Sequence, residues 1–116
     1  MSKNKSDAIV CYYVPKNAPT APRQESAVGV ETKLRELNAR PCVVFYRWED
    51  KGENPLLFFN NILTYHSQNK GVKFIILDNA SKFWASITDY LIYADVLGKM
   101  GVCLIDASNS TRRIKR

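Results

Sequence analysis

The sequence predicts a single α/β domain, a three-layer sandwich in which a mostly parallel four-stranded sheet is buried between helices. Three observations lead to this prediction. Apolar runs alternate along the chain with segments of helical periodicity. The apolar runs are continuous, which is typical of parallel strands covered on both faces. The length of 116 residues leaves room for one ordinary core.

The first strand is expected at residues 8–14, a continuous apolar and β-prone run. Three prolines then exclude regular structure from residues 15–22. A helix is expected over residues 23–38 from the spacing of its apolar residues, and Glu31 and Arg35, four positions apart, support it. Asn38 and Pro41 close this segment. The core-facing positions of the helix recur at helical spacing: Ala27, Val30, Leu34 and Leu37.

The second strand is expected at residues 42–46 and the second helix at residues 55–69. Asn54 is a suitable N-cap for this helix. Pro55 suits the first helical position, because an N–H there would have no partner. The helix is expected to pack through four apolar side chains and the only histidine: Leu56, Phe59, Ile62, Leu63 and His66.

The third strand is expected at residues 72–78, the most hydrophobic of the four runs. A third helix is expected at residues 82–97, capped by Asn79 or Ser81. The fourth strand is expected at residues 101–105. Four apolar side chains are predicted to lie on one face of the third helix: Trp84, Ile87, Leu91 and Ala94.

Strands that alternate with helices form right-handed crossovers and a parallel sheet, for which we expect the order 2-1-3-4. This order reverses direction between the first and third strands. Ligands of such sheets bind at the carboxyl ends of the strands that flank the reversal. Those ends are residues 14–16 and 77–79. A functional site is therefore expected at this edge of the sheet.

The net charge of +6 comes from the two ends of the chain. The predicted domain spans residues 7–106, and residues 7–110 carry eleven basic and eleven acidic side chains. Residues 1–6 and 107–116 are predicted to be basic, flexible arms that extend into solvent. Such arms either grip phosphate backbones or only solubilise the termini, and both interpretations stay open. The candidate nucleic-acid contacts are Lys16, Lys82, Arg112, Arg113, Lys115 and Arg116.

The sequence predicts a cytoplasmic location. No apolar run reaches the roughly 20 residues that a membrane span needs, and the polar start lacks an apolar segment of signal-peptide length. Cys11, Cys42 and Cys103 each lie in an apolar run and are expected to be buried thiols. No cysteine or histidine cluster has metal-ligand spacing, so we expect no metal and no cofactor.

Several kinds of chemistry compete for the predicted edge. A phosphate-binding loop needs glycines, and residues 15–22 contain none. Asp78 would suit a phospho-acceptor, but Pro15 and Lys16 stand where such a domain needs Mg²⁺-binding acids. Ser81 is better explained as a helix cap than as a nucleophile. Asp78 either has a functional role or stabilises the turn after its strand, and the sequence leaves both open.

Four short stretches carry a family resemblance. They are Cys11-Tyr-Tyr-Val-Pro15 with Gln24 entering the next helix, Gly52-Glu-Asn-Pro55, Leu77-Asp-Asn-Ala-Ser-Lys82, and Gly101-Val102. Their order and spacing resemble the catalytic domain of serine site-specific recombinases, the resolvase/invertase family, over most of the chain. The resemblance implies a resolvase-like, more broadly flavodoxin-like, fold. In that family a serine attacks a DNA phosphodiester and arginines stabilise the phosphoryl oxygens.

Departures from the family pattern remove its chemistry. Pro15 stands at the position of the nucleophilic serine and has no nucleophile. The arginine positions carry Tyr13, Asn54, Asn79 and Lys82, whereas Asp78 matches the family. The resemblance therefore implies a degenerate site with no catalytic residues, and we expect no enzyme activity.

The sequence thus predicts a catalytically inactive, recombinase-like domain that acts as a DNA-binding or accessory/regulatory protein in DNA recombination or related DNA transactions. The alternative is a protein–protein interaction or homo-oligomerisation domain with no nucleic-acid role. Surface aromatic residues such as Trp48 or Tyr93 would supply its contacts. An enzyme that uses Asp78 with Lys16 or Lys82 ranks last, because no second acid, base or metal-ligand set accompanies Asp78.

Overall fold

The computed structural model describes residues 5–15, 24–49, 55–69, 71–84 and 86–109. In chain order the main elements are β1 (Ser6–Val14), α1 (Gln24–Leu37), β2 (Ala39–Trp48), α2 (Pro55–Gln68), β3 (Val72–Leu77), α3 (Ile87–Lys99) and β4 (Cys103–Asp106). Two short 3₁₀ helices, η2 (Ala80–Lys82) and η3 (Ala107–Asn109), follow β3 and β4.

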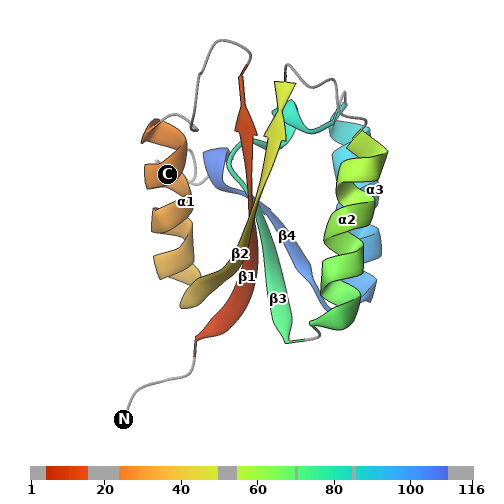
Figure 1. Cartoon of the computed structure of the whole chain (residues 1–116), viewed down its shortest axis with the longest axis horizontal. Helices are drawn as coiled ribbons and strands as arrows, with labels where there is room; N and C mark the ends of the chain where they lie inside the picture. The colour runs from red at the N-terminus through yellow and green to blue at the C-terminus, as the bar shows by residue number, and fades with distance from the viewer. Residues whose placement is uncertain (1–4, 16–23, 50–54, 70, 85, 110–116) are drawn as a thin grey trace.

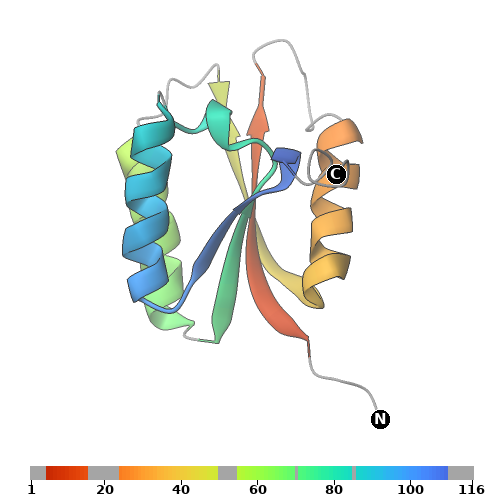
Figure 2. The same cartoon turned by 180° about the vertical axis from the view of Figure 1, so that it is seen from behind.

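The four strands form one sheet in the order β2-β1-β3-β4, and every neighbouring pair is parallel, so the predicted topology is confirmed. α1 covers one face of the sheet and α2 and α3 cover the other (Figure 1), and Figure 2 shows the same layers from behind. β1 and β3 lie in the middle, where Ile9, Cys11, Ile75 and Leu77 are fully buried. Burial on both faces explains why these strands have continuous apolar sequences.

The two faces of the sheet have different cores. The face under α2 and α3 is aromatic: the rings of Phe59 and Trp84 stack with centroids 4.5 Å apart, and Phe83 packs beside them. The face under α1 is aliphatic, built around Val10, Val30 and other small or branched side chains. The face predicted for the first helix is confirmed, since its four positions are buried or half-buried: Ala27, Val30, Leu34 and Leu37.

β2 is longer than the sequence indicated. It begins at Ala39, directly after Asn38, whose left-handed backbone (φ 52°) ends α1. Pro41 was expected to close the preceding segment and instead lies inside the strand. A proline is tolerated there because β2 is an edge strand, so one side of its backbone needs no partner in the sheet.

α3 begins five residues later than predicted. Ser86, not Asn79 or Ser81, is its N-cap, and the Ser86 hydroxyl accepts the N–H of Asp89 at 3.2 Å. Asn79 instead caps the separate 3₁₀ helix η2, and its side chain accepts the N–H of Ser81. The predicted packing face of α3 is also wrong, because two of its four members are exposed. The side chains of α3 that turn toward the protein are Tyr90, Tyr93, Ala94 and Leu97.

Two further expectations need correction. The segment after β4 was expected to extend into solvent from residue 107, but Ala107 is only 3% exposed and belongs to the core beneath α1. Of the three thiols expected to be buried, only Cys11 is; Cys42 and Cys103 are exposed. Both lie on edge strands, where the sheet has no neighbour to cover them. In the described part of the chain, no helix has the length and apolarity to cross a membrane.

Two valines two positions apart on α1 test the packing of the aliphatic core. Val30 is 1% exposed and Val28 is 55% exposed. We expect Val30→Ala to lower the free energy of unfolding by about 2–3 kcal/mol, because it leaves a cavity under the helix. Val28→Ala, the same change with the same gain in helix propensity, should stay within about 0.5 kcal/mol of the parent. Urea unfolding followed by circular dichroism measures both, and equal effects would contradict the packing described.

Candidate functional site

The candidate site lies at the carboxyl edge of the sheet, where strand order reverses between β1 and β3. After β1 the chain forms β2 on one side of β1, and it then returns to form β3 on the other side of β1 (Figure 1). The loops that leave β1 and β3 at this edge therefore diverge toward opposite faces. Tyr13, Pro15, Asp78, Asn79 and Lys82 all come from these two strand ends, as the sequence predicted.

Asp78 connects the two central strands beyond the point where β3 ends. Its own N–H donates to the carbonyl of Cys11 at 3.0 Å. Its carboxylate oxygens accept the N–H of Tyr13 at 3.2 and 3.3 Å. The side chain is 6% exposed, so these bonds are made largely out of water. Of the two interpretations left open, the geometry provides the structural one, although the partner is β1 and not the turn after β3.

A second acid organises the neighbouring loop. One carboxylate oxygen of Asp106, at the end of β4, accepts the N–H of Ala80 at 3.2 Å and the N–H and hydroxyl of Ser108 at 3.0 and 2.7 Å. Asp106 thus ties η2 to η3 across the ends of β3 and β4. Asp78 and Asp106 both accept backbone N–H groups. Among the described residues, no three or more metal-binding side chains form a cluster.

Two cations converge on one aromatic ring at this edge. The guanidinium of Arg47, from β2, lies 5.7 Å from the ring centroid of Tyr13, and the ammonium of Lys82, from η2, lies 5.9 Å from it. Arg47 also donates to the carbonyl oxygen of Lys82 at 3.1 Å, which fixes β2 to η2. We call these three residues the cationic cluster. Its members come from three separate segments and meet only in the folded chain.

Glu49 partly balances the cationic cluster. Burial, the charge of Glu49 and a hydrogen bond with it raise the pKa of the Tyr13 hydroxyl, while Arg47 acts in the opposite direction. The phenol therefore stays protonated at neutral pH. Two cations and the Glu49 carboxylate surround this polar aromatic side chain, and the carboxylates of Asp78 and Asp106 lie at the same edge.

The described residues do not assemble a nucleophile with a base here. The hydroxyl of Ser81 donates to the side-chain oxygen of Asn79 at 2.7 Å, so it belongs to the cap of η2. Pro15, half-buried after β1, offers no hydroxyl. His66 is buried near the far end of α2, next to the connection that enters β3.

The sequence identified only part of this site. The predicted site residues did not include Arg47, although its position at the carboxyl end of a strand beside β1 was an available signal. Asn54, Lys16, Arg112, Arg113, Lys115 and Arg116 lie outside the described residues. Comparison of the chain with protein-family models, curated proteins and solved structures finds no match.

The link between Asp78 and Tyr13 can be tested by stability. We expect Asp78→Ala to cost about 2 kcal/mol of unfolding free energy, because the N–H of Tyr13 loses a charged, buried acceptor. Asp78→Asn should cost less, since the amide oxygen can still accept. Glu36→Ala, which removes an exposed acid from a surface ion pair, should change stability by less than about 0.5 kcal/mol. If Asp78→Ala has no larger effect than Glu36→Ala in urea unfolding, the carboxylate is not a structural link.

The thiols should differ in reactivity. Burial raises the pKa of the Cys11 thiol well above its usual range, and the nearby carboxylate of Asp78 adds to this shift. Thiolate, the reactive form, is therefore disfavoured at Cys11. At pH 8 we expect a disulfide reagent such as Ellman's reagent to modify Cys42 and Cys103 quickly and Cys11 only after denaturation. Rapid reaction of three thiols in the native protein would contradict the burial of Cys11.

Proposed function

We propose that this chain is a recombinase-like domain without catalytic function that binds the DNA backbone through the carboxyl edge of its sheet. The observation that carries the proposal is the cationic cluster, in which Arg47 and Lys82 flank the ring of Tyr13. Cations held by packing from separate elements suit phosphate oxygens, because the charges are already in place before the ligand arrives. The cluster lies at the edge where ligands of such sheets gather.

The resemblance to serine recombinases supports the same edge. In that family the strand end corresponding to Val14 and Pro15 meets the scissile phosphate. A proline there offers no nucleophile, so the proposal includes no covalent link to DNA. The proposal is therefore an accessory or regulatory role in DNA recombination or a related DNA transaction, with binding and without strand cleavage.

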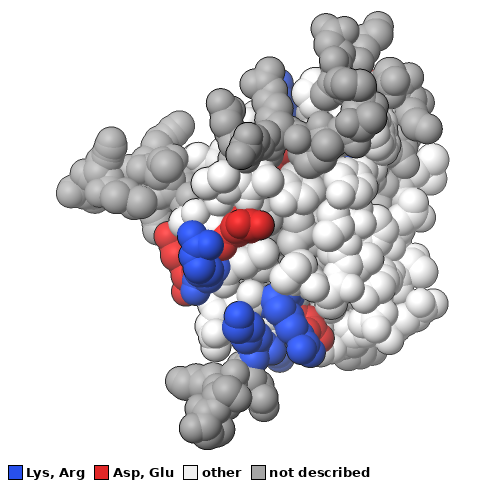
Figure 3. All heavy atoms as spheres, turned by 60° about the vertical axis from the view of Figure 1, so that its left-hand side comes forward, with Lys and Arg blue, Asp and Glu red and all other residues white. Residues whose placement is uncertain are grey.

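The charge of the rest of the domain supports a local contact. Figure 3 brings the α1 side of the molecule forward, and there the described Lys and Arg side chains lie beside Asp and Glu. Among the described residues, Arg40 forms an ion pair with Asp7 at 2.8 Å and Lys33 with Glu36 at 3.0 Å. A surface of mixed sign attracts DNA weakly. DNA binding would then depend on the cationic cluster and on the basic residues at the chain ends.

A salt series with short DNA duplexes tests this proposal. Each neutralised phosphate contributes about 0.9 to the slope of log affinity against log salt. We expect Lys82→Gln to weaken binding several-fold at low salt and to reduce that slope by about one. Lys82 is the cleaner of the two positions, because its contact with Arg47 is made by the backbone carbonyl and survives the change. Fluorescence anisotropy measures the affinity.

Two controls accompany the series. Arg35→Gln removes an exposed cation from the last turn of α1, at the opposite edge of the sheet, and should leave the slope unchanged. Replacing Arg112, Arg113, Lys115 and Arg116 together by Gln measures the contribution of the C-terminal charges. Absence of binding to DNA by the parent chain at low salt, or an equal effect of Arg35→Gln and Lys82→Gln, would refute DNA recognition by the cationic cluster.

A second function, protein–protein interaction, is favoured by a different observation. α3 and its C-cap residue expose five large apolar side chains, each 47–69% accessible: Ile87, Leu91, Ile92, Val96 and the C-cap Met100. Single exposed apolar residues are ordinary, but several on one helix indicate a contact surface. Trp48 and Tyr93, the aromatic residues that the sequence predicted as surface contacts, are half-buried. Tyr93 stacks on Phe59 and packs against Trp84 at a tilted angle in the core.

A further inference from the structure

The exposed side chains of α3 divide into two sets on opposite flanks of the helix. At about 100° per residue, Ile87 and Leu91 lie on the flank that also carries Ala94 and Gly98. Ile92 and Val96 lie on the other flank, toward α2, whose Phe59 stacks on Tyr93. The two flanks expose similar apolar side chains, as Leu91 (57%) and Ile92 (55%) illustrate. The two flanks differ in their surroundings, because a hollow adjoins the flank of Leu91.

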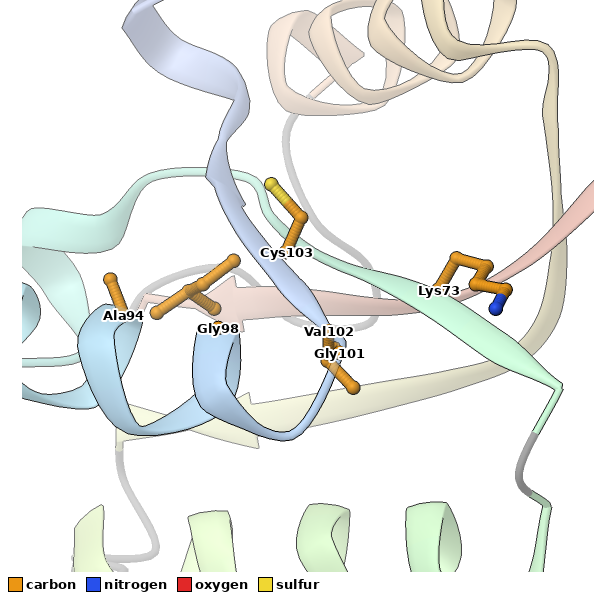
Figure 4. Close-up of a pocket in the computed structure, with 7 residues that line it drawn as sticks. Lys73, Ala94, Gly98, Gly101, Val102 and Cys103 are labelled. Carbon is orange, nitrogen blue, oxygen red and sulfur yellow. The ribbon is translucent and has the colours of Figure 1, made fainter.

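A hollow of about 300 Å³ adjoins the flank of Leu91. Figure 4 shows it between α3, which contributes Ala94 and Gly98, and the turn and strand that follow, which contribute Gly101, Val102 and Cys103. Lys73 of β3 and Leu104 of β4 complete the lining, and the two glycines leave the space open. A Cβ built at Gly98 would meet nothing within 4 Å. β4, which forms the other wall, is an edge strand of the sheet.

The same flank therefore carries a protrusion and a cavity. Leu91 projects from α3, and Gly98, seven positions later, opens the hollow two helical turns away, about 10 Å along the axis. A two-fold axis perpendicular to a helix reverses its direction and keeps the same flank at the contact. Such an axis near Ala94 and Asp95 would bring Leu91 of each copy onto Gly98 of the other. Ile87 would then lie near the partner copy's turn into β4.

We propose that the α3 helices of two copies of this chain pack antiparallel, with Leu91 of each copy filling the hollow of the other. This inference gives the second candidate function a specific partner and rests on that candidate, not on DNA binding. The match is reciprocal, so one helix supplies both halves of the contact. A second copy of the chain suits this surface, because it necessarily presents the same leucine two helical turns from the same hollow.

Charge and area are compatible with this contact. Near the proposed axis, Asp95 would approach its symmetry mate, but each Asp95 already pairs with Lys99 of its own helix at 3.3 Å. The rim thus carries compensated charge. Two 13-residue helices in contact bury on the order of 1,000 Å² in total, near the lower limit for a specific interface. The dimer should therefore be weak, with a dissociation constant on the order of 10 μM.

Sedimentation velocity over a concentration series tests the inference with the full chain. We expect a monomer below about 1 μM and mostly dimer above about 100 μM. Gly98→Leu should fill the hollow and shift the equilibrium at least tenfold toward monomer. Its fold should be retained, because the position is open and leucine favours a helix more than glycine does. Leu91→Asp should have a similar effect, whereas Ile92→Asp, equally exposed on the other flank, should leave the dimer intact.

Cross-linking tests the register of the two helices. Cys103 is not suited to this test, because Val102 and Leu104 beside it belong to the core under α3 and its own side chain turns to the other face of the sheet. In a Cys42→Ser, Cys103→Ser background, Leu91→Cys combined with Gly98→Cys should place thiols of the two copies against each other. Oxidation by copper phenanthroline, which removes two electrons and two protons, should then join two chains through a disulfide. Ile92→Cys combined with Gly98→Cys in the same background should cross-link much less.

The outcomes separate this inference from the DNA-binding proposal. A parent chain that stays monomeric up to about 500 μM, or one whose dimer is lost on Ile92→Asp and kept on Gly98→Leu, overturns the α3 dimer. Lys82→Gln should leave the self-association unchanged. Loss of DNA binding with an intact dimer, or the reverse, then identifies which of the two surfaces functions as described.

Discussion

The parallel pairing of β1 with β3 is the interaction on which the rest of the structure depends. These strands are the only described pair in which both members lie inside the sheet, and their apolar side chains reach both cores. Asp78 extends the pairing past the end of β3 through the N–H of Tyr13. This bond holds Tyr13 where β2 and η2 can reach its ring. The candidate site is thus a continuation of the central ladder.

At the carboxyl edge of the sheet, acids fix the strand ends, and the cationic cluster lies outside them. Asp78 and Asp106 bind backbone N–H groups and fix the ends of β1, β3 and β4. Arg47 and Lys82 are then held at the rim by the ring of Tyr13 and by the carbonyl of Lys82. Asp78 and Asp106 are therefore structural, whereas Glu49 and Arg47 interact with the side chain of Tyr13. Lys82 is the exposed cation of the cluster.

α3 has an exposed apolar surface because it packs at the edge of the sheet, where the described chain covers only one of its sides. α2 and the aromatic cluster take the side of α3 that carries Tyr90, Tyr93 and Leu97. β4 is the last strand, so no further element of the described chain lies beyond it to cover the flank of Leu91. Glycines at positions 98 and 101 then leave a hollow where a larger side chain would have filled the gap. Convex and concave apolar surfaces lie side by side as a result.

The sequence by itself determined the order of elements, the parallel sheet and the edge that holds the candidate site. These follow from local signals: continuous apolar runs for strands buried on both faces, helical spacing for α1, and the crossover rule for the strand order. The same signals misplaced the start of α3 and extended the predicted helix over η2. Asn79 caps η2 and not α3, and the N–H of Ala80 in η2 donates to Asp106. The local sequence does not reveal this bond, because Asp106 lies 26 positions away.

Only the tertiary structure decided which residues meet. Arg47 and Lys82 are 35 positions apart, and Tyr13 and Asp78 are 65 apart. No local pattern couples such pairs, because their contact depends on the register of β1 against both neighbours. The face of α3 was decided in the same way. Its sequence is apolar on more than half of its circumference, and packing against one edge of the sheet selected Tyr90, Tyr93 and Leu97 and left Ile87 and Leu91 in solvent.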